Sequence, residues 1–165
     1  MGGILLKEAK KVYKTYSRDK VVESVEEMKE NPYNPDTQRE RCDVLWAMVT
    51  NRLSDAYNRR SHRRIAAVGG VQVVMDVLKN HNQDLALRAA CRLLAELALD
   101  RVNSEAMRVG NAQERLEKCA KELYDDEYVT ADVRRALKNM QQTGAHLEHD
   151  HIKARRGDRL VCINK

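Results

Sequence analysis

The sequence predicts an all-α fold, and three observations support this prediction. The 165 residues include only seven glycines and two prolines, too few turn formers for the many short strands of a sandwich or barrel. Apolar residues recur in steps of three and four along most of the chain, which is the spacing of one helix face. The motif Val68-Gly69-Gly70-Val71 recurs 41 positions later in altered form, as Val109-Gly110-Asn111-Ala112.

The first part of the chain predicts helices on both sides of a proline turn. Apolar positions within residues 4–31 follow helical spacing and indicate one broken helix or two successive helices. The segment Asn31–Asp36 holds both prolines and predicts a helix end, because proline fixes φ and lacks a backbone donor. Asp36 or Thr37 can cap the next helix, which we expect to continue to about Leu53.

The middle of the chain predicts a group of three helices. Residues 61–99 indicate a short helix, a break at Gly69-Gly70, a second helix, a polar turn and a third helix. Two glycines permit positive φ and a close crossing of the two helices that they join. Residues 102–141 repeat this plan, and an earlier copy without its short first helix precedes residue 60. The expected units are 20–58, 61–100 and 102–142, stacked so that each buries its neighbour's apolar face.

Basic segments flank the expected units. Residues 1–19 predict a basic N-terminal helical arm. Residues 143–165 include Gly144 and Gly157 and show little helical period, so we expect a basic, extended and irregular tail that orders only against a partner.

The segment 65–78 and the helix after it resemble the armadillo repeat, which has a short helix, Gly-Gly-Ile/Val, a leucine-rich helix and a third helix ending in Ala-Leu-x-x-Leu-Ala. The matching residues are Ile65, Ala66, Ala67, Val68, Gly69, Gly70, Val71, Ala90, Leu94, Leu97 and Ala98. The resemblance is specific over 61–99 and weaker over 102–141, where Asn111 replaces the second glycine. Before residue 60 only the spacing agrees. The resemblance to the armadillo repeat implies a short right-handed α-solenoid of about three repeats.

The resemblance also implies a groove lined by the third helices, where an asparagine holds the backbone of an extended partner peptide. Superposing the three units places Asn51, Glu96 and Asn139 at that position. The groove tryptophan of nuclear-import receptors falls at Ala47, Arg92 and Arg135, which argues against an importin-like binder of basic signals. The candidate groove residues are Asn51, Arg92, Glu96, Arg135 and Asn139. The alternative is that these polar side chains merely solvate a helix face.

Positive charge is concentrated in patches. The chain has 30 Lys and Arg against 25 Asp and Glu, a formal net charge of +5. One cluster is Arg59, Arg60, Arg63 and Arg64, and another, in the tail, includes Arg155, Arg156 and Arg159. Such patches attract acidic surfaces, whether nucleic acid, acidic peptide or the face of a polymer such as tubulin. The alternative is that they are solvated faces.

Catalytic and metal sites are not indicated. The sequence has no nucleophile elbow, phosphate-cradling loop or dinucleotide-binding motif, so we expect neither an enzyme nor a cofactor. His146, His149 and His151 are weak metal candidates, because a closed site usually draws ligands from two separated elements. Cys42, Cys91 and Cys119 lie on predicted apolar faces and are expected as reduced core residues, with Trp46 as a core anchor.

These observations lead to one functional prediction and one alternative. We expect a non-enzymatic adaptor or structural subunit of a larger intracellular assembly, binding other proteins through its groove and basic tail. An acidic cytoskeletal surface such as tubulin would suit its charge, with a cytoplasmic, cytoskeletal, ciliary or flagellar location. The alternative is a nucleic-acid-binding helical module that uses the Lys and Arg clusters. No membrane insertion is expected, since the mean hydropathy is −0.68.

Overall fold

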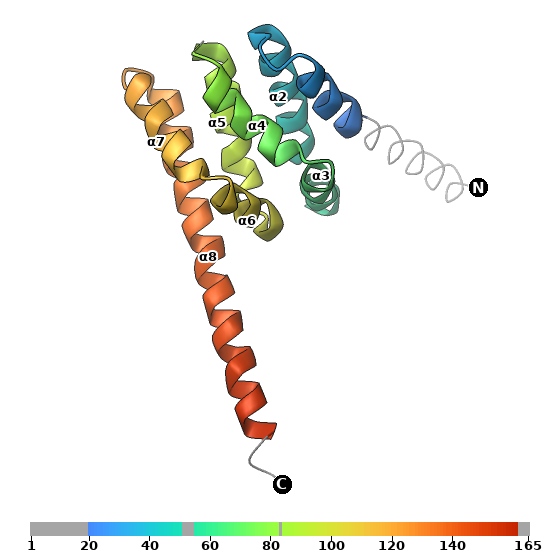
Figure 1. Ribbon diagram of the computed structural model, residues 1–165, viewed down its shortest axis with the longest axis vertical. Helices are drawn as coiled ribbons and strands as arrows, with labels where there is room; N and C mark the ends of the chain where they lie inside the picture. The colour runs from blue at the N-terminus through green and yellow to red at the C-terminus, as the bar shows by residue number, and fades with distance from the viewer. Residues whose placement is uncertain (1–19, 51–54, 83, 162–165) are drawn as a thin grey trace, which may run out of the picture.

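The computed structural model describes residues 20–50, 55–82 and 84–161, and side chains within them as far as residue 144 except that of residue 84. All regular structure in these ranges is helical and none is strand, which confirms the all-α prediction. Residues 20–30 form the first described helix (Figure 1). The others are α2 (Pro35–Val49), α3 (Asp55–Ala67), α4 (Gly70–Asn80), α5 (Asp84–Leu97), α6 (Arg101–Val109), α7 (Ala112–Glu122) and α8 (Glu127–Val161).

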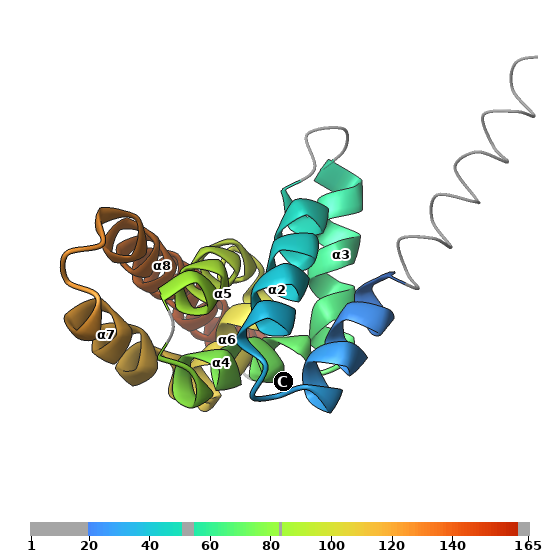
Figure 2. The same ribbon diagram turned by 90° about the horizontal axis from the view of Figure 1, so that it is seen from above.

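The helices form two layers, and two further helices lie at one end of them. Helices α2, α5 and α8 lie side by side, and α5 is packed between the other two (Figure 2). Residues 20–30, α4 and α7 form the second layer beneath them. Helices α3 and α6 contact each other at the lower end of the bundle in Figure 1. The turns that lead into α2, α5 and α8 therefore share the opposite end.

Helix α5 forms the centre of the core. Leu93, Leu94 and Leu97 are completely buried, as are the small residues Ala90 and Ala95. Small side chains allow neighbouring helices to approach closely, which a central helix with neighbours on several sides requires. Because apolar burial is the main favourable term in folding, α5 holds both layers together.

The proline turn ends the first described helix and caps the second differently from our expectation. The cap is Asn34, whose side-chain oxygen accepts hydrogen bonds from the backbone N–H groups of Asp36 and Thr37, each at 3.1 Å. Pro35 takes the first helical position, where a missing N–H costs nothing. Asp36 and Thr37 are thus the capped residues. Helix α2 ends at Val49 rather than near Leu53, and residues 51–54 lie outside the described ranges.

The two glycines of the break between α3 and α4 have different roles. Gly69 has φ of 76°, a left-handed conformation that glycine adopts without strain. A Cβ on Gly70 would lie 2.7 Å from Ile65 Cγ2 and 3.0 Å from Val25 Cγ2, so this position lets two helices approach. Between α6 and α7, Asn111 has φ of 56° and Ala112 is buried. Asn111 therefore takes the place of the first glycine, not the second, and the structural offset is 42 residues.

The prediction of an irregular tail is wrong over residues 143–161, because α8 continues as one helix to Val161 (Figure 1). Residues 143–161 contain no proline and many good helix formers, and each of Gly144 and Gly157 costs a helix only about 1 kcal/mol relative to alanine. Gly144 also fits closely against α6, since a Cβ there would lie 2.6 Å from Arg108 Nη1. The predicted arm, residues 1–19, and residues 162–165 lie outside the described ranges.

Candidate interaction surfaces

The first candidate surface is the layer of α2, α5 and α8, where the predicted groove residues meet. Arg92 on α5 forms an ion pair with Asp43 on α2, with 2.5 Å between Nη2 and Oδ1. The guanidinium carbon of Arg92 also lies 4.3 Å from the centre of the Trp46 ring, a cation–π distance. Trp46 is half-buried at the contact of α2 with the core, which agrees with its expected role as an anchor. Arg92 thus joins α2 to α5.

The other groove residues join α5 to α8. Arg135 lies 2.8 Å from Glu96 on α5, measured from Nη1 to Oε1, and 2.9 Å from Asp132 one turn earlier on its own helix. Burial raises the pKa of the Asp132 carboxyl, and the positive charges of Arg135 and Arg92 offset part of that rise. Acidic and basic side chains therefore alternate across the three helices, each charge facing a charge of the opposite sign.

Asn139 completes the end of α5. Its Nδ2 donates a hydrogen bond of 2.9 Å to the backbone carbonyl of Ala95. The last carbonyls of a helix lack a partner within the helix. Here Leu94, Glu96 and Leu97 accept from the backbone N–H groups that follow them, while Ala95 accepts from Asn139.

The structure thus brings four of the five predicted groove residues onto one face. All four, Arg92, Glu96, Arg135 and Asn139, bind neighbouring helices of the same chain. The fifth, Asn51, lies outside the described residues. Sequence reasoning missed Asp43 and Asp132, which complete the ion pairs. Only the Asp132–Arg135 spacing of three residues gave a signal, because i,i+3 pairs meet on one helix.

The second candidate surface is the arginine cluster on α3, which we call the α3 arginine patch (Arg59, Arg60, Arg63 and Arg64). Arg59, Arg60 and Arg63 are exposed and Arg64 is half-buried, while Ser61, His62 and Ile65 face the core. The spacings of three and four residues place the arginines next to one another on the helix surface.

The arginines of the patch have no partners within the described part of the chain: no ion pair or side-chain hydrogen bond involves any of them. Arg39 and Arg134 share this property but lie singly on other helices. By contrast, six arginines elsewhere form ion pairs: Arg41, Arg88, Arg92, Arg108, Arg115 and Arg135.

His62 lies beneath the patch, on the inner side of α3. It is 7% exposed, and burial lowers its pKa, while the nearby charge of Asp100 and a hydrogen bond with the Val49 backbone offset part of that effect. Its Nδ1 has no hydrogen-bond partner among the described residues. A neutral ring therefore suits this position, and the positive charge of α3 lies on its outer side.

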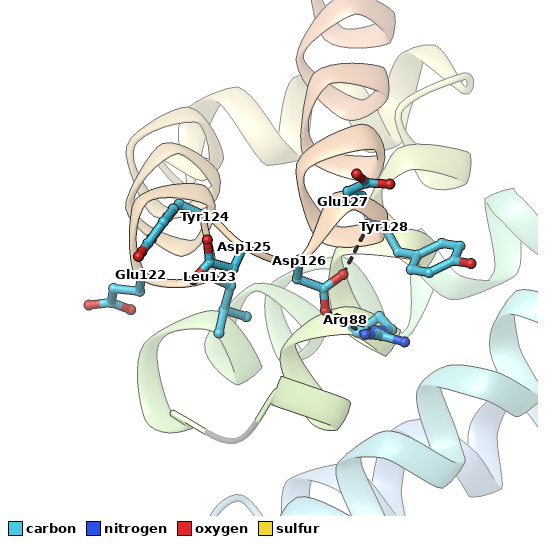
Figure 3. Close-up of a pocket in the computed structure, with 8 residues that line it drawn as sticks. All are labelled: Arg88, Glu122, Leu123, Tyr124, Asp125, Asp126, Glu127 and Tyr128. Atoms are coloured by element: carbon cyan, nitrogen blue, oxygen red, sulfur yellow. Dashed lines mark hydrogen bonds and ion pairs between the residues drawn. The ribbon is translucent and has the colours of Figure 1, made fainter.

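A third feature is an open cleft of about 700 Å³ at the turn from α7 to α8 (Figure 3). Arg88 Nε donates to Asp126 at 3.1 Å, and its guanidinium lies 5.2 Å from the centre of the Tyr128 ring. Asp126 also accepts from the backbone N–H groups of Tyr128 and Val129, so it caps α8. Burial raises the pKa of Asp126, but these donors outweigh it and leave the pKa below its usual value. Arg88 and Asp126 thus position the start of α8.

Two predicted sites fall in the part of α8 where the structure describes the backbone but not the side chains. The metal candidates His146, His149 and His151 and the tail arginines Arg155, Arg156 and Arg159 all fall on its helical backbone. Among the described residues, no cluster of three His, Cys, Asp or Glu side chains could hold a metal ion. Within the same residues, no helix combines the length and apolar character needed to span a membrane.

Comparisons with protein-family models, with curated proteins and with solved structures find no match for this chain.

Proposed function

We propose that this chain is a short armadillo-like α-solenoid that serves as a non-enzymatic adaptor or structural subunit, docking on an acidic protein surface through the α3 arginine patch. The order of the helices supports the solenoid proposal. A first helix, a left-handed residue, a second helix and a third helix follow one another in 55–97 and again from residue 101 onward. Residues 20–30 and α2 correspond to the last two helices of an earlier unit.

The observation that carries the docking proposal is the concentration of unpaired charge on α3. Like charges four residues apart, as at Arg59 and Arg63 or at Arg60 and Arg64, destabilise an isolated helix by about 0.2–0.5 kcal/mol per pair. Asp55 lies one turn before Arg59 on α3, but no acidic side chain in the described residues forms an ion pair with the patch to offset this cost. A partner rich in carboxylates would supply it, since guanidinium groups bind carboxylates through paired hydrogen bonds.

The layer of α2, α5 and α8 is a less suitable binding surface. Its charged groups already satisfy one another between helices, so a peptide would have to break Asp43–Arg92 or Glu96–Arg135 before gaining contacts. The side-chain donor of Asn139 is already bonded to Ala95. We therefore assign the groove residues to stability and α3 to binding.

An acidic cytoskeletal polymer is the partner we propose within this class. Tubulin presents such a surface, so the location we propose is the cytoplasm and the cytoskeleton, including that of a cilium or flagellum. The test is co-sedimentation of the full chain with microtubules, before and after their acidic tails are removed by protease. Binding that is lost with the tails supports the proposal, and unchanged binding contradicts it.

The alternative is a nucleic-acid-binding module that uses the same patch. The observation in its favour is that guanidinium groups bind phosphates as well as carboxylates. Titration of the full chain with double- and single-stranded RNA distinguishes the two. Tight RNA binding that weakens steeply between about 50 and 200 mM salt would favour the alternative. RNA that fails to displace the chain from microtubules would favour the acidic-protein partner.

A further inference from the structure

Two buried thiols from different helices touch in the core. Cys91 lies on α5 and Cys119 on α7, and their Sγ atoms are 3.6 Å apart. Cys91 is 0% exposed and Cys119 is 2% exposed. Nothing separates the sulfur atoms at this distance, so their side chains already point toward each other.

The two thiols are distant in sequence, but their sulfur atoms lie close together in the fold. A disulfide has an S–S bond of about 2.05 Å, so the sulfurs need to approach by about 1.5 Å. The two positions are 28 apart in sequence, and the segment between them includes all of α6. A bond here would therefore tie α7 to the central helix and close a loop around α6.

We propose that Cys91 and Cys119 form a redox modification site, at which hydrogen peroxide converts the two thiols into a disulfide between α5 and α7. Peroxide first oxidises one sulfur to a sulfenic acid and releases one water molecule. The second sulfur attacks the sulfenic sulfur, forming the S–S bond and releasing a second water. The two thiols lose two electrons and two protons, and one peroxide is reduced to two waters.

The structure indicates which sulfur reacts first. Helix α7 buries only Ala112, Leu116 and Cys119, and its other side chains are largely charged. Helices with few buried apolar contacts open locally at lower free energy than the core. Helix α5 is the core itself, so opening of α7 exposes Cys119 while Cys91 stays in place. Closure of α7 then returns the oxidised sulfur to Cys91.

Burial slows the oxidation of these thiols and makes it depend on local opening of the fold. The hydrogen bond with Cys119 and burial both raise the pKa of the Cys91 thiol, so it stays protonated in the closed state. The reactive species is the thiolate, and reaction therefore depends on opening. Cys42 provides an internal comparison, because it is equally buried and lies near enough to influence Cys91, but in the described residues no hydrogen bond joins its sulfur to another thiol.

The test uses the full chain with Cys162→Ser, so that the fourth cysteine cannot take part. The folded protein is treated with hydrogen peroxide, and intact mass and peptide mapping are measured before and after reduction. We expect a loss of about 2 Da, a crosslinked peptide pair containing Cys91 and Cys119, and recovery on reduction. The oxidised protein should melt roughly 5–10 °C higher, because the crosslink restricts the unfolded chain.

Two variants keep the test interpretable. Cys42→Ala should still form the link, whereas Cys119→Ala should lose it while retaining its helical circular dichroism. The proposal is overturned if the folded protein gains oxygen without losing about 2 Da, or if the crosslink joins Cys42.

Discussion

The arginines of this protein differ in what they bind. Arg92 and Arg135 each join two helices of one layer, with ion-pair distances of 2.5 and 2.8 Å to their partners. Those of the α3 arginine patch contact no acidic group in the described residues. Ion pairs on protein surfaces contribute little stability, about 0–1 kcal/mol each, so their absence on α3 leaves the fold intact. The same side chains are then available to a partner.

Asn139 tests whether the groove residues are structural. Changing Asn139→Ala removes the donor to the Ala95 carbonyl and leaves that carbonyl unbonded at the end of α5. We expect the free energy of unfolding to fall by about 1 kcal/mol, the usual contribution of one such hydrogen bond. Urea unfolding measures it, with Lys138→Ala as a control on an exposed neighbour. Unchanged stability in Asn139→Ala would return this residue to a binding role.

His62 gives the fold a dependence on pH. Because burial lowers the pKa of His62, the unfolded chain takes up a proton near the ordinary value of about 6.5, and the folded chain does so only at lower pH. The stability associated with the neutral ring is therefore present above about pH 6.5 and is lost as pH falls below it.

The measurement is the free energy of unfolding at about pH 7.5 and about pH 5.5, in the parent chain and in His62→Gln. We expect the parent to lose more stability on acidification than the variant. The carboxyls of Asp126 and Asp132 titrate in both proteins, so the difference isolates His62. Equal losses in both would show that His62 does not carry the effect.

At the scale of the helix elements, the two glycines of the Gly69-Gly70 break meet different requirements. Gly69 adopts a left-handed backbone conformation, and Gly70 leaves room for close packing. Gly69→Asn should be tolerated, because Asn111 adopts the same left-handed conformation at the corresponding position before α7. Gly70→Ala should lower the free energy of unfolding by about 1–3 kcal/mol, the usual cost of overpacking. Its Cβ would meet Ile65 and Val25, which outweighs the higher helix propensity of alanine. Thermal melts of both variants check the order, and a more damaging Gly69→Asn would contradict it.

Helix α8 can be tested by removing its end. The last buried apolar residue described on α8 is Met140, and Thr143 still binds Ser104 on α6 at 2.6 Å. A chain ending at Gly144 should therefore keep its melting temperature to within a few degrees. It should lose the circular dichroism of the helical residues 145–161. An unchanged helical signal would show that this segment is not helical.

The elements also show how far sequence reasoning reaches. The glycine break, the proline turn and the order of helices were predictable, because local backbone preferences and apolar spacing encode them. The choice of Asn34 over Asp36 as the α2 cap depended on which residue precedes Pro35. The helical form of residues 143–161 was missed because two glycines do not outweigh good helix formers. The partners of Arg92 and Asn139 lie on other helices, so no local pattern specified them.

At the scale of the whole molecule, the central helix and the proposed binding surface are separate. Helix α5 joins the layers through buried apolar side chains, whereas α3 lies at one end with its arginines outward. A fold organised in this way can change its partner without disturbing its core. It also predicts that charge position, rather than net charge, determines binding.

The most direct test of this claim compares two variants of equal charge. One carries Arg59→Gln, Arg60→Gln and Arg63→Gln, and the other carries Arg39→Gln, Lys79→Gln and Arg134→Gln, at exposed positions on α2, α4 and α8. Binding of the parent chain and of each variant to microtubules is measured by co-sedimentation, with thermal melts to confirm folding. We predict that the α3 variant loses at least about tenfold in affinity, a change of about 1.4 kcal/mol, while the other variant stays near the parent. Equal losses in both variants would contradict the assignment of binding to α3.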